Sequence, residues 1–211
     1  MSIKAYRPIT PAQRQKTTQD FDQITTKKPL RSLTKSKKQM AGKNNQGRIT
    51  VRHRGGGVKR HYRIVTYSLP QDGKYTIREI EYDPNRSARI ARVQDQNGVY
   101  YYVIADNNMH QGMTFETGKE AAVETSNRMP IRNIPVGTFI YAIELTPGRG
   151  AQMVRSAGTS AQLMAKEDNY ATLKMPSGEM RKVLIDCEAS IGTVGNEQHQ
   201  NIKIGAAGRR R

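Results

Sequence analysis

The sequence predicts an all-β protein in which two small barrels follow a basic, extended N-terminal arm. Three observations support this: short runs of β-branched and aromatic residues separated by turns from residue 62 onward, no long helical periodicity, and positive charge concentrated at one end. A chain of 211 residues with 36% apolar residues is large enough for two modest cores. We expect an arm (1–59), a first barrel (60–128), a second barrel (129–200) and the start of a basic C-terminal extension (201–211).

Charge is distributed unevenly along the chain, whose formal net charge is +17. Residues 1–63 contain 17 Lys and Arg but only two acids, Asp20 and Asp22, whereas residues 64–211 contain 18 Lys and Arg against 16 Asp and Glu. The concentration of positive charge in residues 1–63 predicts a polyanionic partner. The alternative interpretation of this stretch is a solubilising tail. We expect the arm to be disordered when free and to follow an extended path on that partner.

The cysteine count and the distribution of apolar residues bear on where in the cell the protein is expected. Cys187 is the single cysteine, so an intrachain disulfide is excluded and a reducing compartment, the cytoplasm, is expected. The sequence near Met1 is not an apolar leader, and no run of about 18 apolar residues occurs. We therefore expect neither secretion nor contact with a membrane.

Five short strands are expected in the first barrel, at residues 62–68, 74–82, 89–93, 99–105 and 113–115. Tyr75 and Ile77 share one face of the second run, but Ile80 and Tyr82 share the other, which predicts a β-bulge near residues 78 and 79. A five-stranded barrel of this size is what an oligonucleotide-binding fold requires. Which of Tyr100, Tyr101 and Tyr102 could stack on a base stays open, because neighbours in a strand alternate sides.

A second group of short strands follows residues 127–137, where two prolines and a glycine suggest an inter-domain joint. The expected strands are residues 138–145, 151–154, 160–166, 170–174 and 180–185. Turns at Pro147-Gly148, Asp168-Asn169 and Ser177-Gly178 divide them. This spacing indicates a small barrel of the SH3-like kind.

The stretch GRITVRHRGGGVKRHYR, residues 47–63, is the strongest candidate for binding RNA. Glycine has no Cβ and lets another backbone approach closely, so main-chain N–H groups could face phosphate oxygens beside arginine side chains. A flexible linker is the alternative, but linkers rarely combine glycine with so many cations. The candidate residues are Arg48, Arg52, His53, Arg54, Gly55, Gly56, Gly57, Lys59, Arg60 and Arg63.

Further cations and hydroxyls lie at turns of the two barrels. In YDPNRSARIARV, Arg86 and Arg89 flank small residues, and we interpret them as RNA contacts because nearby Asp83 could hardly pair with both. The segments RSAGTS (155–160) and SGEMRKV (177–183) combine glycine, hydroxyls and cations. Ordinary turn chemistry is the alternative for all of them. The additional candidates are Ser87, Arg132, Arg149, Arg155, Ser156, Gly158, Thr159, Arg181, Lys182, Arg209 and Arg210.

Signals for catalysis are weak. Gly148-Arg149-Gly150 lacks the third glycine of a dinucleotide loop, no GxxxxGK[ST] motif occurs, and the four histidines do not have zinc-ligand spacing. Paired carboxylates such as Glu79 and Glu81 are typical of a solvated strand face. We expect no enzyme activity, catalytic residue, metal, cofactor or small-molecule substrate.

Five motifs in order closely resemble the family of large ribosomal subunit protein two. They are GRITVRHRGGGVKRHYRIV, EYDPNRSARIA, MPIRNIPVGT, PGRGAQMVRSAGT, and SGEMRKV followed by DCEASIGTVGN. The resemblance implies an oligonucleotide-binding barrel followed by an SH3-like barrel. It implies a primary binding protein of 23S-type large-subunit ribosomal RNA that supports assembly, subunit association and the peptidyl-transferase centre. The implied partners in the ribosome are that RNA, other ribosomal proteins and the small subunit.

The resemblance departs at the C-terminus. The family normally continues into a long basic tail with a His-Pro-His-Gly-Gly-Gly motif, whereas this sequence stops at Arg211. Either the protein is shorter than its relatives or the sequence lacks a further segment. Two other function classes fit the composition less well: a free RNA chaperone or translation factor with tandem barrels, and an RNA-modifying enzyme.

Overall fold

The computed structural model describes residues 3–55, 57–70 and 72–210, and it is all-β as predicted. The first barrel contains β5 (Gly73–Glu81), β6 (Ile90–Gln94), β7 (Tyr100–Ile104) and β8 (Thr114–Thr117). The second contains β9 (Arg128–Pro130), η2 (Ile131–Asn133), β10 (Phe139–Tyr141), β11 (Ala161–Glu167), β12 (Tyr170–Lys174), β13 (Met180–Leu184) and β14 (Glu188–Ile191).

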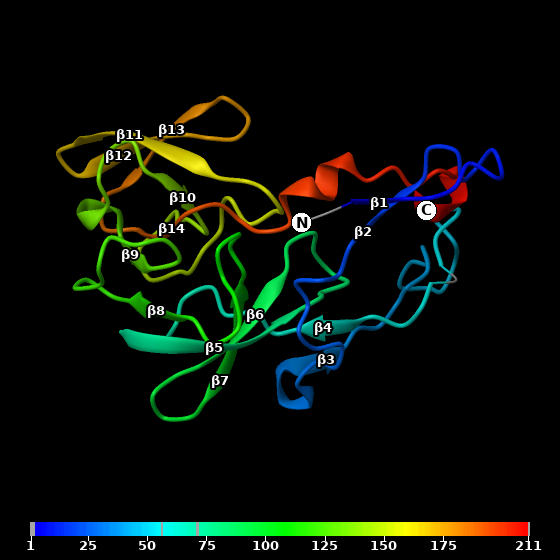
Figure 1. Cartoon of the computed structure of the whole chain (residues 1–211), viewed down its shortest axis with the longest axis horizontal. Coiled ribbons are helices and arrows are strands. Elements are labelled where there is room, and N and C mark those ends of the chain that lie inside the picture. Colours follow the sequence, from blue (N-terminus) through cyan, green and yellow to red (C-terminus); the bar gives the residue numbers. More distant parts are fainter. Residues whose placement is uncertain (1–2, 56, 71, 211) are drawn as a thin grey trace.

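One continuous sheet joins the two barrels, with strand order β13-β12-β11-β10-β14-β9-β8-β5-β6-β7 (Figure 1). The junction is a parallel pairing of β8 with β9, in which Thr117 faces Arg128. Neighbouring strands elsewhere in this sheet pair antiparallel. The barrels therefore share backbone hydrogen bonding instead of meeting only through a flexible linker.

The predicted bulge in the first barrel is confirmed. The register between β5 and β6 shifts between Ile77 and Glu79, so Arg78 is the extra residue. The bulge changes the face on which side chains lie, and Tyr75, Ile77 and Ile80 therefore all point into the core. Tyr75 stacks on Phe115 there, with ring centres 5.7 Å apart.

The predicted strand at residues 62–68 is shorter in the structure. β4 (His61–Arg63) pairs with β3 (Thr34–Ser36) of the arm, after which Val65 forms an isolated bridge with Tyr102 of β7. The chain thus changes its pairing partner after residue 63. This change ends the regular strand before residue 68.

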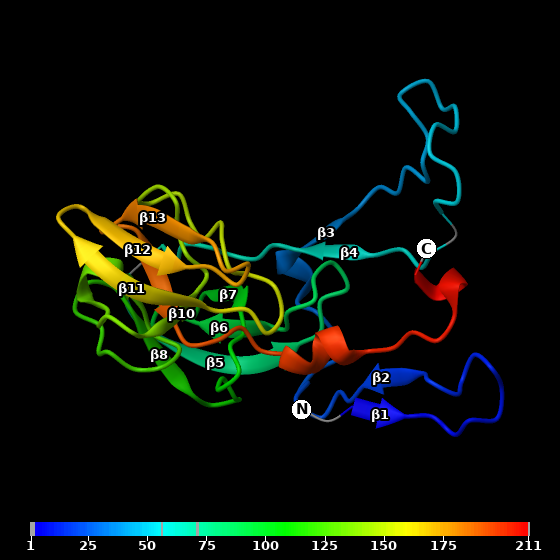
Figure 2. The same cartoon turned by 90° about the horizontal axis from the view of Figure 1, so that it is seen from above.

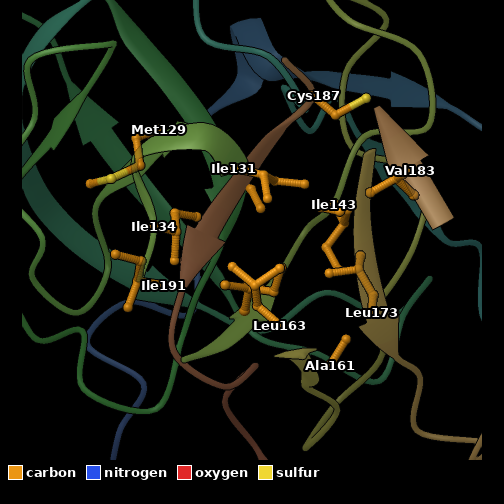
Figure 3. Packing of buried hydrophobic residues seen from close by; sticks show 13 residues of the cluster. Met129, Ile131, Ile134, Ile143, Ala161, Leu163, Leu173, Val183, Cys187 and Ile191 are labelled. Carbon is orange, nitrogen blue, oxygen red and sulfur yellow. The ribbon is translucent and has the colours of Figure 1, made fainter. Parts of the chain in front are cut away.

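The core of the second barrel is built from large aliphatic side chains, including Ile131, Ile134, Leu163 and Leu173 (Figure 3). The stretch 127–137, where the sequence suggests an inter-domain joint, contains β9 and η2 and buries Met129, Ile131 and Ile134 in the second barrel. The strand predicted at residues 151–154 is wrong, since only the single bridge between Met153 and Ile143 forms there.

Parts of the arm form secondary structure and contact the barrels, while its disorder in the absence of a partner stays a prediction. β1 (Ile3–Ala5) and β2 (Thr17–Gln19) form a hairpin, and η1 (Arg31–Leu33) precedes the β3–β4 hairpin. Leu30 packs on the first-barrel core, and its N–H donates to the Tyr102 hydroxyl over 2.8 Å. Sequence alone could not show that the barrel supplies the apolar surface that the arm lacks.

The C-terminal segment lies beside the N-terminal hairpin (Figure 2). Thr17 N–H donates to the Lys203 carbonyl over 2.9 Å, and Lys203 N–H donates to the Thr17 hydroxyl over 2.8 Å. This segment contains η3 (Glu197–Asn201) and η4 (Ala207–Arg210). The N-terminal hairpin and the C-terminal segment therefore meet on one side of the barrels.

Candidate nucleic-acid interface

A long connection between β3 and β4, residues 37–60, projects away from the barrels (Figure 2); we call it the basic loop. The sequence has no Asp or Glu between Asp22 and Asp72, so no carboxylate of this stretch offsets the positive charge. Solvent-exposed cations occur along the loop: Lys37, Lys38, Lys43, Arg48, Arg52, Arg54, Lys59 and Arg60. A projecting segment of one charge is suited to a polyanion.

Gly42 fixes the path of the basic loop. Its carbonyl accepts the N–H groups of Thr50 and Val51 over 2.9 and 3.1 Å, which closes the loop on itself. Its φ is +74°, and a Cβ here would lie 2.2 Å from the Val51 carbonyl oxygen. Only glycine fits this position. This role is not visible in the sequence, because Gly42 stands apart from the glycine run.

The predicted glycine run has a more specific role than general flexibility. Gly55 has φ +129°, and a Cβ would meet the Ala41 side chain at 3.2 Å, so this residue lets two parts of the loop pack together. At Gly57 an added Cβ would approach only the Gln39 amide, at 3.9 Å. His53 also has positive φ. Gly56 lies outside the described residues.

The base of the loop is anchored on the turn that follows β5. Asn85 donates to the His61 carbonyl over 2.8 Å, and Arg60 Nη1 donates to the Pro84 carbonyl over 3.4 Å. Arg63 is buried and donates to the same His61 carbonyl over 2.8 Å. Arg63 is therefore a support for the loop and is not among its exposed cations.

Two predicted arginines from different barrels meet at Tyr67, a place that we call the seam. Arg86 Nη1 donates to the Tyr67 hydroxyl over 2.6 Å, while the Arg155 guanidinium lies over the Tyr67 ring, 4.7 Å from its centre. The Ala157 N–H donates to the Ser87 hydroxyl over 3.1 Å. The turn at residues 86–87 and the segment at residues 155–157, which are distant in the chain, are thus brought together.

Asp83 pairs with only one of Arg86 and Arg89, as the sequence suggests, but both arginines are held within the structure. Arg86 Nε pairs with the buried Asp83 carboxylate over 2.7 Å. Burial by itself would lower the pKa of Arg86, but its bonds to Asp83 and Tyr67 outweigh burial and raise the pKa. Both arginines therefore belong to the packed structure of the turn, and Arg86 is exposed only in part.

Arg89 is only 3% exposed. Its guanidinium lies 5.1 Å from the Phe21 ring centre and 5.4 Å from that of Tyr82, and Nη2 donates to the Gln19 side chain over 3.0 Å. Burial lowers its pKa. Arg89 thus joins the arm to the first barrel, and its interpretation as an exposed turn cation is wrong.

Two family models match the chain. One, described as Ribosomal Proteins L2, RNA binding N-terminal domain, matches residues 30–117, and the other, described as Ribosomal Proteins L2, C-terminal domain, matches residues 124–211. The chain belongs to the ribosomal L2 family. Its two domains indicate a large-subunit ribosomal protein that binds RNA, and the interval between the matches falls between β8 and β9.

Other residues of this L2 protein that were predicted to contact RNA lie on the second barrel. Arg132 pairs with Asp186 over 2.9 Å and Lys182 with Glu167 over 3.3 Å, and these four side chains are well exposed. Because each cation is already paired, it has less to offer a phosphate. Arg181 contacts the Met153 sulfur over 3.7 Å.

The segment at residues 155–160 is built around a close contact with η3. Gly158 has φ +68°, and an added Cβ would lie 2.9 Å from the Glu197 Cα. Thr159 donates its hydroxyl to the Ser156 carbonyl over 2.7 Å. Arg155 and Ser156 themselves are exposed, as are Arg149 and Arg209 elsewhere. For Arg210 only the backbone is described.

Buried polar side chains that the sequence did not single out stabilise each barrel from within. Arg128 is buried, pairs with Glu144 over 3.3 Å and with Glu188 over 3.0 Å, and donates to the Ala142 carbonyl over 2.8 Å. Of the three consecutive tyrosines, Tyr102 is fully buried and donates to Glu81 over 2.8 Å. It is therefore unable to stack on a base.

Within the described part of the chain, no helix is long and apolar enough to cross a membrane. A search of the same residues for three or more His, Cys, Asp or Glu side chains placed to hold a metal ion finds none.

Proposed function

We propose that this L2-family protein is a primary binder of 23S-type ribosomal RNA, held by the basic loop and the seam. The supporting observation is the continuous path between them: the loop carries exposed cations without a nearby acid in sequence, and its base is bonded to the turn that contains Arg86. The phosphate groups of an RNA strand can be neutralised by the loop cations, and arginine forks at the seam add directed hydrogen bonds.

From this binding role we propose support for large-subunit assembly, for association with the small subunit and for the peptidyl-transferase centre. The loop and the seam are both bonded to the turn at residues 84–86, so one RNA region bound to both would be held in a fixed orientation. Other ribosomal proteins, the small subunit and the cytoplasmic ribosome are the proposed surroundings. The structural character of the family favours a scaffold over an enzyme.

Sedimentation tests this proposal against a free RNA chaperone. A tagged full-length chain should travel with large subunits on sucrose gradients and stay with them after a high-salt wash. Depletion of the protein should lower the amount of large subunits and leave small subunits unchanged. Recovery of the washed chain in the soluble fraction, with normal subunit levels after depletion, would favour the chaperone.

A further inference from the structure

The two sides of the basic loop enclose a hollow of about 470 Å³. The residues that line it are Lys37, Lys38, Gln39, Ala41, Gly42, Val51, Arg54, Gly55, Gly57, Val58 and Arg60. We propose that this hollow receives a single unstacked nucleotide of the bound RNA. The inference rests on the proposed function and adds a specific subsite to it.

The chemistry of the lining matches the parts of a nucleotide. Ala41, Val51 and Val58 offer apolar surface for the face of a base, and the Gln39 amide can both donate to and accept from a base edge. The lining cations can neutralise the flanking phosphates. Unstacked bases in loops and bulges are the usual target of selective RNA recognition.

Size and charge together favour this occupant over a protein segment. The volume of the hollow lies within the range of roughly 300 to 1,000 Å³ that is typical of small-ligand sites. A hollow of this size accommodates one nucleotide. The lining contains cations but no carboxylate, so a basic ribosomal protein would be repelled. An RNA strand, in contrast, brings one phosphate with every base.

The shape of the hollow is fixed by contacts within the loop. The bonds from Thr50 and Val51 to the Gly42 carbonyl hold one wall, and the packing of Gly55 against Ala41 holds the other. Exposed Val58, at 90%, leaves one side of the site open for entry. A base that enters gains apolar contact with side chains that are otherwise in water.

Gly57→Leu tests the subsite, because it fills the hollow without changing charge. An added Cβ at Gly57 meets no backbone, since the nearest atom is Nε2 of the Gln39 side chain, 3.9 Å away. The matched control is Gln46→Leu, an exposed position on the same loop outside the lining. Both full-length variants are titrated with a large-subunit ribosomal RNA transcript and probed with base-modifying reagents.

The expected result for Gly57→Leu is loss of protection at one unpaired nucleotide and about tenfold weaker binding, with the salt dependence of binding unchanged. Gln46→Leu should behave as the wild type. A second variant, Gln39→Leu, should keep most of the affinity but tolerate any base at that nucleotide. Wild-type footprints and affinity in both Gly57→Leu and Gln39→Leu would overturn the subsite, whereas failure of the wild-type chain to bind the RNA would overturn the proposed function itself.

Discussion

The guanidinium of Arg155 lies over the ring of Tyr67, so a cation of the second barrel rests on an aromatic side chain that belongs to the first. The hydroxyl of the same tyrosine accepts a hydrogen bond from Arg86. One side chain thus positions two arginines before any RNA arrives. Groups held in place beforehand lose less conformational entropy when they bind.

Tyr67→Phe removes the hydroxyl but keeps the ring. We expect the free energy of unfolding to fall by about 1.5 kcal/mol, because a hydrogen bond from a charged group is lost, while Arg155 keeps its contact. Urea denaturation measures this change. Tyr67→Ala removes both contacts and should also weaken binding to large-subunit RNA; RNA affinity equal to that of the wild type would contradict a role for the seam.

Arg86→Ala should destabilise the fold strongly, because it leaves the Asp83 carboxylate, whose side chain is 0% exposed, without its cation. Loss of one partner of a buried pair costs about 3 kcal/mol. Combining it with Asp83→Asn removes the charge and should restore part of the loss, which a double-mutant cycle measures. An unchanged melting temperature for Arg86→Ala would mean that the pair is unimportant.

Gly42→Ala should weaken RNA binding and leave the melting of the barrels unchanged. The new Cβ would collide with the Val51 carbonyl, so the basic loop must open, but the loop does not contribute to either barrel core. Gly47→Ala is the matched control: Gly47 also has positive φ, yet nothing lies within 4 Å of its Cβ position. Equal RNA affinities for the two variants would argue against a fixed loop shape.

Asp106 should make stability depend on pH in the opposite direction from a carboxylate whose pKa is lowered on folding. Burial raises the pKa of Asp106 above its ordinary value of 3.8, although bonds from Ser126, Met109 and Asn108 oppose the shift. The folded state then holds the proton more tightly than the unfolded state, so this contribution to the free energy of unfolding falls as pH rises from 3.8 through the raised pKa.

Asp106→Asn removes that contribution and keeps an acceptor for the two N–H groups. Denaturation at a series of pH values from 4 to 7, roughly the range in which a raised carboxyl titrates, should show a difference between variant and wild type that changes with pH. Parallel curves would show that the carboxylate does not titrate there.

Local patterns were sufficient for the parts of the fold that depend on neighbouring residues. The parity change after Ile77 gave the bulge, and the β-branched runs gave most of the strands. β14 was missed, although Cys187, Ala189 and Ile191 alternate toward the core as a strand requires. Because these side chains are small and of mixed type, their alternation with a period of two is a weak strand signal in the sequence.

The candidate site was harder to predict, because an arginine looks the same in sequence whether it is free or paired. The composition of the glycine-rich, cationic stretch at residues 47–63 was sufficient to predict that most of its side chains are exposed. The partners of Arg86 and Arg89, by contrast, include Tyr67 and Phe21, which are distant in the chain and contribute no motif. Only the packing of the arm and the second barrel on the first reveals them.

The central claim, that the basic loop binds RNA by neutralising phosphates, is tested most directly by the salt dependence of affinity. The loop variant carries three substitutions in the basic loop, Arg52→Gln, Arg54→Gln and Lys59→Gln. The control variant instead loses three exposed cations of the barrels through Lys74→Gln, Lys119→Gln and Lys174→Gln. The slope of log K against log salt for large-subunit RNA should shrink by about 2 in the loop variant, at about 0.7 to 0.9 per contact, and stay near the wild-type value in the control. Equal slopes for the two variants would contradict the claim.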